Sequence, residues 1–397
     1  EEEEEEEEDY SDDEDTSWKV RRAASKCLAA VCSTRPEMLE SLYQAVCPVL
    51  LRRFGEREES VRLDVIATFG ELVKQTAAAP GAPQRLLAPV VPALVKAYAK
   101  QLKGRSPKSK VAALALMREV AQCLPSAFDQ HLSAVVPGVD RVLSDKGSAS
   151  NLRIEALAFT RLALSSHTPA AVQPHLKALA PPVFAAVGDR YYKVAAEALR
   201  VCGEMVGVVR PEPAAAADAA TCAALYKAVS ARLTAQDQDA EVKEAVITCT
   251  GRMVALLGDK LAAELPACLP VLLERLRNEI TRVTAVKAVE SIVRSPLALD
   301  LSPLLEPAAA ELTGFLRKSN RPLRLASLNA LEPLASNHGG ALKPGTVELL
   351  VTEASALISD ADLQLAGGAV RLCTTAMGRA PQAAAGAAWG GAQAPGR

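Results

Sequence analysis

A helical phrase recurs nine times along this chain, and its spacing restricts the fold more than any other feature. Its clearest copy is SWKVRRAASKCLAAV, which begins at Ser17, and a later copy is AEVKEAVITCTGRMV, which begins at Ala240. The aligned anchor positions are Val20, Val61, Val111, Leu152, Val194, Val242, Thr281, Leu323 and Leu363. The steps between them are 41, 50, 41, 42, 48, 39, 42 and 40 residues. A period of 40–47 residues with two helices per unit is typical of HEAT and armadillo repeats.

The composition agrees with an array of thin helical layers. Of the 397 residues only 4% are aromatic, whereas a single deep core usually contains more Phe, Tyr and Trp. Alternating β-branched runs, the signal for strands, are hard to find. We therefore predict an all-α HEAT-repeat α-solenoid, a right-handed superhelix of antiparallel helical hairpins in which each repeat covers its neighbour.

Prolines favour HEAT repeats over tetratricopeptide repeats. The first helix of most hairpins is predicted to contain an internal proline, and an internal proline kinks a helix. Kinked first helices on the convex side, with straighter second helices on the concave side, are typical of HEAT arrays. The prolines are Pro48, Pro92, Pro137, Pro182, Pro270 and Pro307.

The two ends of the chain differ from the repeats. Residues 1–15, EEEEEEEEDYSDDED, are nearly all acidic and read as a disordered linker because such a run repels itself. Residues 16–380 hold about nine HEAT repeats, and residues 381–397 are predicted to be a low-complexity, disordered tail. Neither end shows the polar capping repeat that arrays require for solubility, so we expect an internal piece of a longer solenoid.

Charge and cysteine usage exclude several classes of function. The net charge of −2 gives no basis for a nucleic-acid partner, which requires a strongly basic face. No run is both long and hydrophobic enough to cross a membrane. The nine cysteines form no C-x-x-C pair, so we expect reduced, structural thiols in an intracellular protein, with neither disulfides nor zinc.

Signatures of catalysis are missing from the sequence. It contains no nucleotide-binding glycine loop, no H-E-x-x-H and no G-x-S-x-G. The histidines, which we place at helix ends or in loops rather than in a metal site, are His131, His167, His175 and His338. Tyr191 and Tyr192 precede Lys193, a pattern found in some oxidoreductases, but no nucleotide loop accompanies it. We predict no enzyme activity, no cofactor, no metal and no small-molecule substrate.

Basic residues recur just after the anchor in six of the nine repeats: Arg21, Arg62, Arg153, Lys243, Arg282 and Arg324. They could form a concave stripe that binds an acidic partner. Alternatively, they could form a structural ladder within the hairpins, because an acid lies six residues earlier in the pairs Asp15–Arg21, Glu56–Arg62 and Asp237–Lys243. We prefer the ladder and assign partner contact to other, more exposed bases, namely Lys19, Arg22, Arg105, Lys108 and Lys110.

Several stretches are more specific than a generic repeat. They include DYSDDEDTSWKVRRAASKCLAAVCSTRPEM from Asp9, SNLRIEAL from Ser150 and QPHLKALAPPVFAAVGDRYYKV from Gln173. Together with the repeat phase, they resemble the middle of the cullin-associated, neddylation-dissociated protein family over about residues 9–380.

This resemblance implies a non-catalytic scaffold in the cytoplasm and nucleus. Such a scaffold wraps an unmodified cullin with its RING subunit, promotes exchange of substrate-receptor modules, and is excluded when the cullin carries its ubiquitin-like modifier. The resemblance supplies no catalytic residue. Two alternatives share the repeat type: a nuclear transport receptor and a phosphatase-type scaffold.

Overall fold

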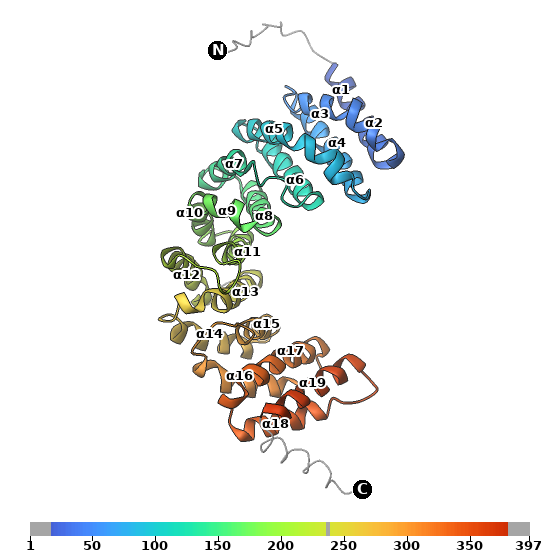
Figure 1. Cartoon of the computed structure of the whole chain (residues 1–397). Helices are drawn as coiled ribbons and strands as arrows, with labels where there is room; N and C mark the ends of the chain where they lie inside the picture. The colour runs from blue at the N-terminus through green and yellow to red at the C-terminus, as the bar shows by residue number, and fades with distance from the viewer. Residues whose placement is uncertain (1–16, 236–238, 380–397) are drawn as a thin grey trace. The chain divides into compact units, whose positions relative to one another are not determined.

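The computed structural model describes residues 17–235 and 239–379, and these are almost entirely helical (Figure 1). No strand occurs within these two ranges, which confirms the all-α prediction. The predicted acidic linker and low-complexity tail lie outside the described residues. The chain divides at Thr168 and Pro169 into two units of stacked helical hairpins.

Unit 1 consists of two layers of helices. In one layer α1, α4, α6 and α8 pack against each other in chain order, and in the other α3, α5 and α7 do the same. The helices are α1 (Ser17–Thr34), α2 (Leu39–Ala45), α3 (Cys47–Arg53), α4 (Glu59–Ala78), α5 (Val91–Lys103), α6 (Pro107–Cys123), α7 (Leu132–Ser144) and α8 (Ser150–Ser166).

Unit 2 repeats the arrangement: α11, α13, α15, α17 and α19 form one layer, and α10, α12, α14, α16 and α18 form the other. Its helices are α9 (Pro169–Val172), α10 (Leu176–Val187), α11 (Tyr192–Val209), α12 (Ala219–Thr234), α13 (Ala240–Leu257), α14 (Leu265–Arg277), α15 (Arg282–Val293), α16 (Ser302–Phe315), α17 (Arg321–His338), α18 (Pro344–Ser355) and α19 (Leu363–Arg379).

The anchor positions explain this layering. Every anchor lies in, or directly before, a helix of the layer α1, α4, α6, α8 in unit 1 or α11, α13, α15, α17, α19 in unit 2. We call these the anchor helices. The fully buried anchors are Val61, Leu152, Val194, Val242, Thr281 and Leu323. Val20 and Leu363 are 71% and 77% exposed, since the structure describes no hairpin before α1 or after α19 that could cover them.

The proline prediction is right for four helices and wrong for two. Pro137, Pro182, Pro270 and Pro307 lie inside α7, α10, α14 and α16. Pro48 and Pro92 instead occupy the first turn of α3 and α5. A proline costs little there, because the first N–H groups of a helix have no partner within the helix.

The four histidines all lie at helix ends or in a short turn, as predicted. His131 directly precedes α7, His167 directly follows α8, His175 lies in a single 3₁₀ turn, and His338 is the last residue of α17. Within residues 17–235 and 239–379, no group of His, Cys, Asp and Glu could hold a metal ion. The same residues contain no helix long and apolar enough to span a membrane.

His167 makes the stability of unit 1 depend on pH. Its ring stacks on Phe128 with centroids 5.4 Å apart. Its Nε2 accepts a hydrogen bond from the Phe128 N–H at 3.0 Å, and its Nδ1 donates to the Ala163 carbonyl at 3.0 Å. Burial lowers the pKa of His167, against the weaker opposing effect of Asp129. The folded state therefore requires the neutral ring.

Lowering the pH is thus expected to destabilise unit 1 through His167. The unfolded chain binds the proton more readily than the folded one, so the free energy of unfolding falls as pH drops below the unfolded value of about 6.5. Urea denaturation at pH 7.5 and 5.5 measures this change. His167→Gln should remove part of the difference and His175→Gln should leave it intact, while equal pH sensitivity in both variants would contradict the assignment.

Candidate partner-binding edge

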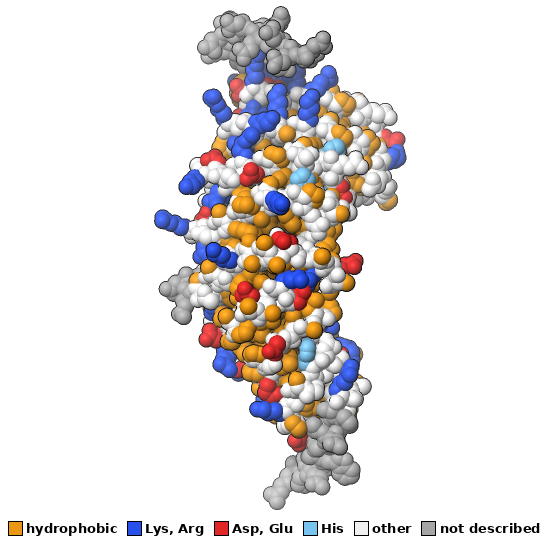
Figure 2. Space-filling view, turned by 60° about the vertical axis from the view of Figure 1, so that its left-hand side comes forward, with side chains coloured by type: hydrophobic (Ala, Val, Ile, Leu, Met, Phe, Trp, Pro, Cys, Tyr) orange, Lys and Arg blue, Asp and Glu red, His pale blue; other side chains and the backbone are white. Residues whose placement is uncertain are grey.

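The turns between the two helices of each hairpin lie where the anchor helices begin. In unit 1 these are residues 54–58, 104–106 and 145–149, which we call the turn edge. Figure 2 shows Lys and Arg side chains gathered near the N-terminal end of unit 1. Exposed bases on this edge or in the adjoining helix ends are Arg52, Arg53, Arg57, Lys100, Lys103, Arg105, Lys108, Arg141 and Lys146.

Short polar side chains fix the geometry of these turns. The Asp145 Oδ1 accepts from the Gly147 N–H at 2.9 Å, and the Ser106 Oγ accepts from the Ser109 N–H at 3.0 Å. Unit 2 repeats the Asp145 pattern with Asp189, Asn278 and Asp362, each of which accepts from the N–H two residues later. These local bonds hold the backbone at the start of each anchor helix.

Arginines after the anchor cap carbonyl groups of their own hairpin. Arg62 Nη1 donates to the Glu56 carbonyl at 2.6 Å, and Arg282 Nε donates to the Leu276 carbonyl at 3.2 Å. Arg324 makes the same bond to the Lys318 carbonyl. In every case the acceptor lies six residues earlier, and a guanidinium there binds carbonyl oxygens that the end of a helix leaves unpaired.

The predicted acid–base ladder within the hairpins is therefore wrong for Glu56 and Arg62. Arg62 binds the main-chain oxygen of Glu56 and not its carboxylate. The Leu276 and Lys318 acceptors show that no acid is needed at this position. The other two predicted acids, Asp15 and Asp237, lie outside the described residues.

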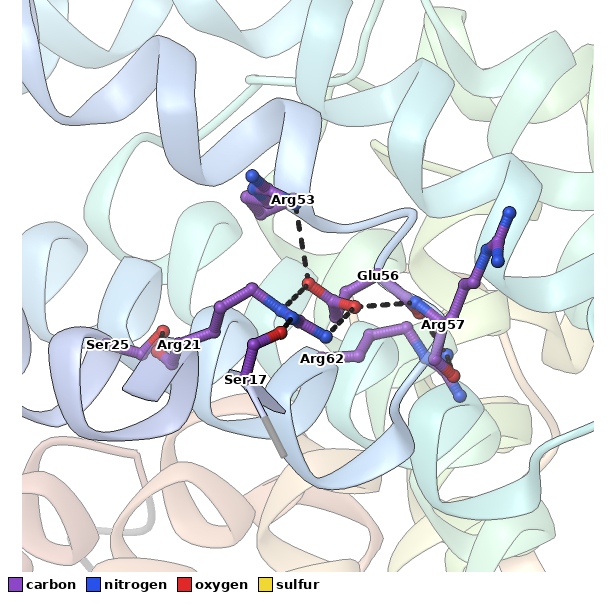
Figure 3. A network of polar contacts seen from close by, with 7 residues as sticks. All are labelled: Ser17, Arg21, Ser25, Arg53, Glu56, Arg57 and Arg62. Atoms are coloured by element: carbon purple, nitrogen blue, oxygen red, sulfur yellow. Dashed lines mark hydrogen bonds and ion pairs between the residues drawn. The ribbon is translucent and has the colours of Figure 1, made fainter. Parts of the chain in front are cut away.

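The carboxylate of Glu56 has a different role (Figure 3). It is 8% exposed and accepts from Arg21 Nε at 3.1 Å and Arg21 Nη2 at 3.2 Å. Arg53 lies 3.6 Å away, and the Arg57 N–H donates to the same carboxylate at 3.0 Å. Glu56 thus joins α1 to the turn before α4, linking neighbouring repeats.

The caps can be tested at Arg282, whose side chain is 17% exposed and packs over the Phe315 ring at 5.0 Å. Position 276, six residues earlier, is a leucine, and the exposed Glu279 carboxylate lies 3.8 Å from the guanidinium. Arg282→Met keeps much of the apolar contact but removes the bonds to the Leu276 and Arg277 carbonyls. We expect it to lower the free energy of unfolding by about 1–2 kcal/mol. Urea denaturation measures this loss, and an unchanged midpoint would show that the carbonyl bonds do not stabilise the hairpin.

Ion pairs also connect successive anchor helices. Arg22 on α1 pairs with Asp64 on α4 at 2.8 Å, and Arg118 on α6 pairs with Glu155 on α8 at 2.7 Å. In unit 2, Arg200 on α11 pairs with Glu241 on α13 at 2.7 Å. The partners are 42, 37 and 41 residues apart, close to the repeat period. A search of the sequence for opposite charges about one repeat apart could have found these bridges.

A groove of about 360 Å³ opens on the turn edge between the first two turns. Phe54 and Gln101 line it, and the Gln101 amide donates to the Phe54 carbonyl at 2.6 Å. Arg62 also lines it and donates to Ser109 Oγ at 2.9 Å. Exposed Lys100 and Arg105 add positive charge. The groove therefore presents a fixed, hydrogen-bonded interior with basic side chains that an acidic partner could reach.

The predicted partner-contact bases are dispersed. Arg105 lines the groove. Lys108, in the first turn of α6, has its Nζ 3.8 Å from Glu59, and Lys110 is half-buried in the same helical turn. Lys19 is exposed on α1, and its Nζ lies 5.8 Å from the centroid of the Trp18 ring. Arg22 already forms an ion pair with Asp64. Sequence reasoning missed Lys100, whose position beside Arg105 depends on the turn.

The family model and the similar sequences of known proteins agree with each other. A family model described as "CAND1-like, TPR repeats" matches residues 126–250. The chain is 49% identical over 373 residues to Cullin-associated NEDD8-dissociated protein 1 of Arabidopsis thaliana, covering 91% of this chain and 31% of that protein. It is 42% identical over 378 residues to Cullin-associated NEDD8-dissociated protein 2 of Mus musculus, covering 92% and 31%. The chain thus spans about a third of the length of these relatives.

Solved structures similar to this chain include karyopherins. Kap121p bound to Pho4p matches with a TM-score of 0.68 and 12% identity, covering 95% of this chain and 41% of that chain. Kap95p bound to RanGDP matches with a TM-score of 0.68 and 18% identity, covering 92% and 44%. At such low identity the likeness is one of fold. The repeat steps of 39–50 residues also exceed the 34 residues of a tetratricopeptide repeat.

Proposed function

Because this chain belongs to the family of cullin-associated NEDD8-dissociated proteins, we propose that it is a non-catalytic scaffold that binds a cullin and regulates cullin-RING ubiquitin ligases. The observation that carries this proposal is the relatedness of up to 49% identity along 91% of the chain. The relatives are named for cullin association, and the match runs through most of the stacked repeats. We therefore expect cullin binding to depend on a surface that extends over many repeats.

The physical character of the repeats supports a binding role. Each hairpin contacts mainly its neighbours, so an array exposes long edges and flexes through many small interfaces. A scaffold of this kind changes what a ligase binds by favouring one bound state over another, which requires a coupling of only a few kcal/mol. No bond-making by the scaffold is needed.

The finer parts of the proposal concern the partner's state. We propose that the bound form is the unmodified cullin with its RING subunit, that binding promotes exchange of substrate-receptor modules, and that the protein acts in the cytoplasm and nucleus. We assign the basic turn edge of unit 1 to contact with acidic residues of that partner, because charge complementarity increases association rate and specificity.

Capture of a purified cullin–RING complex tests the proposal. We expect the chain to retain the unmodified complex and to retain much less of the complex whose cullin carries its ubiquitin-like modifier. Equal capture of both forms would refute the dependence on modification, and capture of neither would refute cullin binding.

Charge reversal tests the assignment of the turn edge. Lys100→Glu with Arg105→Glu should weaken capture in a salt-dependent manner. Lys227→Glu, an exposed base on α12 in unit 2, is the control and should leave capture unchanged. Equal effects of the two changes would refute the specific role of this edge.

A further inference from the structure

A pair of exposed tyrosines lies where the turn after α10 leads into α11: Tyr191 directly precedes this helix and Tyr192 is its first residue. Tyr191 and Tyr192 are 40% and 36% exposed, and among the described residues no other aromatic side chain is as exposed. Their rings meet edge to face, with centroids 5.4 Å apart and planes at 72°. In a chain with 4% aromatic residues, two exposed rings side by side form an unusual surface.

The surrounding structure holds this turn in place from two directions. The Asp189 Oδ1 accepts from the Tyr191 N–H at 2.8 Å. Arg232, on α12 of the following hairpin, donates to the Val187 and Asp189 carbonyls at 2.8 Å each. The backbone that carries the tyrosines is therefore fixed before any partner arrives, which reduces the entropy cost of binding.

The fold itself does not use the exposed parts of the two tyrosines. Within the described part of the chain, neither hydroxyl has a hydrogen-bond partner in the structure. Rings that only filled space between helices would be buried, as Tyr98 and Phe159 are. Tyrosine is one of the side chains, with Trp and Arg, that are enriched among the residues that dominate the binding energy of protein interfaces.

Basic side chains on both sides indicate what the tyrosines would bind. Arg190 and Lys193 are both exposed, and Lys193 Nζ lies 5.8 Å from the centroid of the Tyr192 ring. The two tyrosines thus lie between two basic residues in the sequence, and one of these bases lies over a tyrosine ring. The complement of this surface is a protein segment with an apolar or aromatic side chain flanked by carboxylates.

We propose that the segment Arg190, Tyr191, Tyr192 and Lys193, at the start of α11, is an anchor through which unit 2 holds the cullin. It takes a segment of the cullin whose apolar side chain is flanked by acidic residues. This inference rests on the proposed function. It is separate from the basic groove of unit 1, which contains no exposed aromatic residue.

The test is a calorimetric titration of the chain with a purified, unmodified cullin–RING complex. The double variant Tyr191→Ala, Tyr192→Ala should raise Kd at least about 30-fold, since truncation of an aromatic anchor has effects of this size. The conservative double variant Tyr191→Phe, Tyr192→Phe should stay within about threefold of the natural chain. Leu349→Ala removes a comparably exposed apolar side chain from α18 and should have no effect.

Two further measurements separate binding from folding and from the broader proposal. Arg190→Glu with Lys193→Glu should weaken binding and reduce its salt dependence, and backbone amides 188–194 should exchange hydrogen more slowly in the complex. If the chain binds but the alanine pair has no effect and these amides keep their exchange rates, the anchor is refuted and cullin binding stands. If the natural chain does not bind the complex, both proposals are refuted.

Discussion

Replacing Gly251 with alanine is expected to lower the free energy of unfolding of unit 2 by about 1–3 kcal/mol, although alanine is the better helix former. Gly251 lies inside α13, where that helix crosses α15. A Cβ atom there would lie 2.8 Å from the Cβ of Ala288 and 2.9 Å from its Cα. Because the obstacle includes backbone, the two helices must move apart, and part of their contact is lost.

Gly207 provides the matched control. It lies inside α11, and the nearest atom to an added Cβ is the flexible Arg252 Nη2 at 3.7 Å, an ordinary contact. Gly207→Ala should therefore increase stability by about 0.5–1 kcal/mol. Urea denaturation gives the two opposite shifts, and hydrogen exchange should be faster in α13 and α15 of the Gly251 variant alone. Shifts of the same sign would show that the crossing tolerates a larger residue.

The layered fold could be predicted because one anchor position recurs in every repeat at a regular spacing. Val61, Leu152 and Val242 are buried where the period places them. The close approach at Gly251 could not be predicted, since a glycine inside a helical pattern indicates only a weaker helix. Its meaning depends on Ala288, which lies 37 positions later on the next anchor helix, and only the crossing of two helices brings them together.

The candidate edge could be predicted in residue type but not in pairing. Arg105 follows a glycine in the turn and Lys108 follows the proline that begins α6, so the exposure of both follows from the sequence. The partner of Arg62 could not be found by searching for acids, because its acceptors include main-chain carbonyls present at every residue. Glu56 pairs with Arg21, 35 positions earlier, so its contact depends on how repeats stack.

Replacing Arg210 with methionine is expected to lower the free energy of unfolding of unit 2 by about 1.5–3 kcal/mol. Arg210 follows α11 and is 4% exposed. Its Nη1 and Nη2 bind the two carboxylate oxygens of Asp259 at 2.5 and 2.9 Å, and Nη1 also donates to the Leu256 carbonyl at 2.9 Å. Methionine fills part of the space but leaves the carbonyl and the carboxylate without this donor.

The same pair has a defined pH dependence. The Arg210 guanidinium holds the pKa of Asp259 below its usual value, so the unfolded chain binds this proton more readily than the folded one. The pair's contribution is present above the unfolded pKa of about 3.9 and is lost as pH falls through the folded value. The stability difference between the natural chain and Arg210→Met should therefore be constant from pH 7 to 5 and narrow below pH 4.

Two further variants distinguish the Arg210–Asp259 pair from an ordinary surface ion pair. Arg200→Met removes a more exposed arginine of α11 that pairs with Glu241, and it should reduce stability by less than about 1 kcal/mol. Arg210→Met combined with Asp259→Leu should recover part of the loss, because the Asp259 carboxylate, which is 34% exposed, is then not left without its guanidinium partner. Urea denaturation of the natural chain and the three variants measures these differences in the free energy of unfolding. An equal loss for Arg200→Met and Arg210→Met would show that the greater burial of Arg210 contributes nothing to stability.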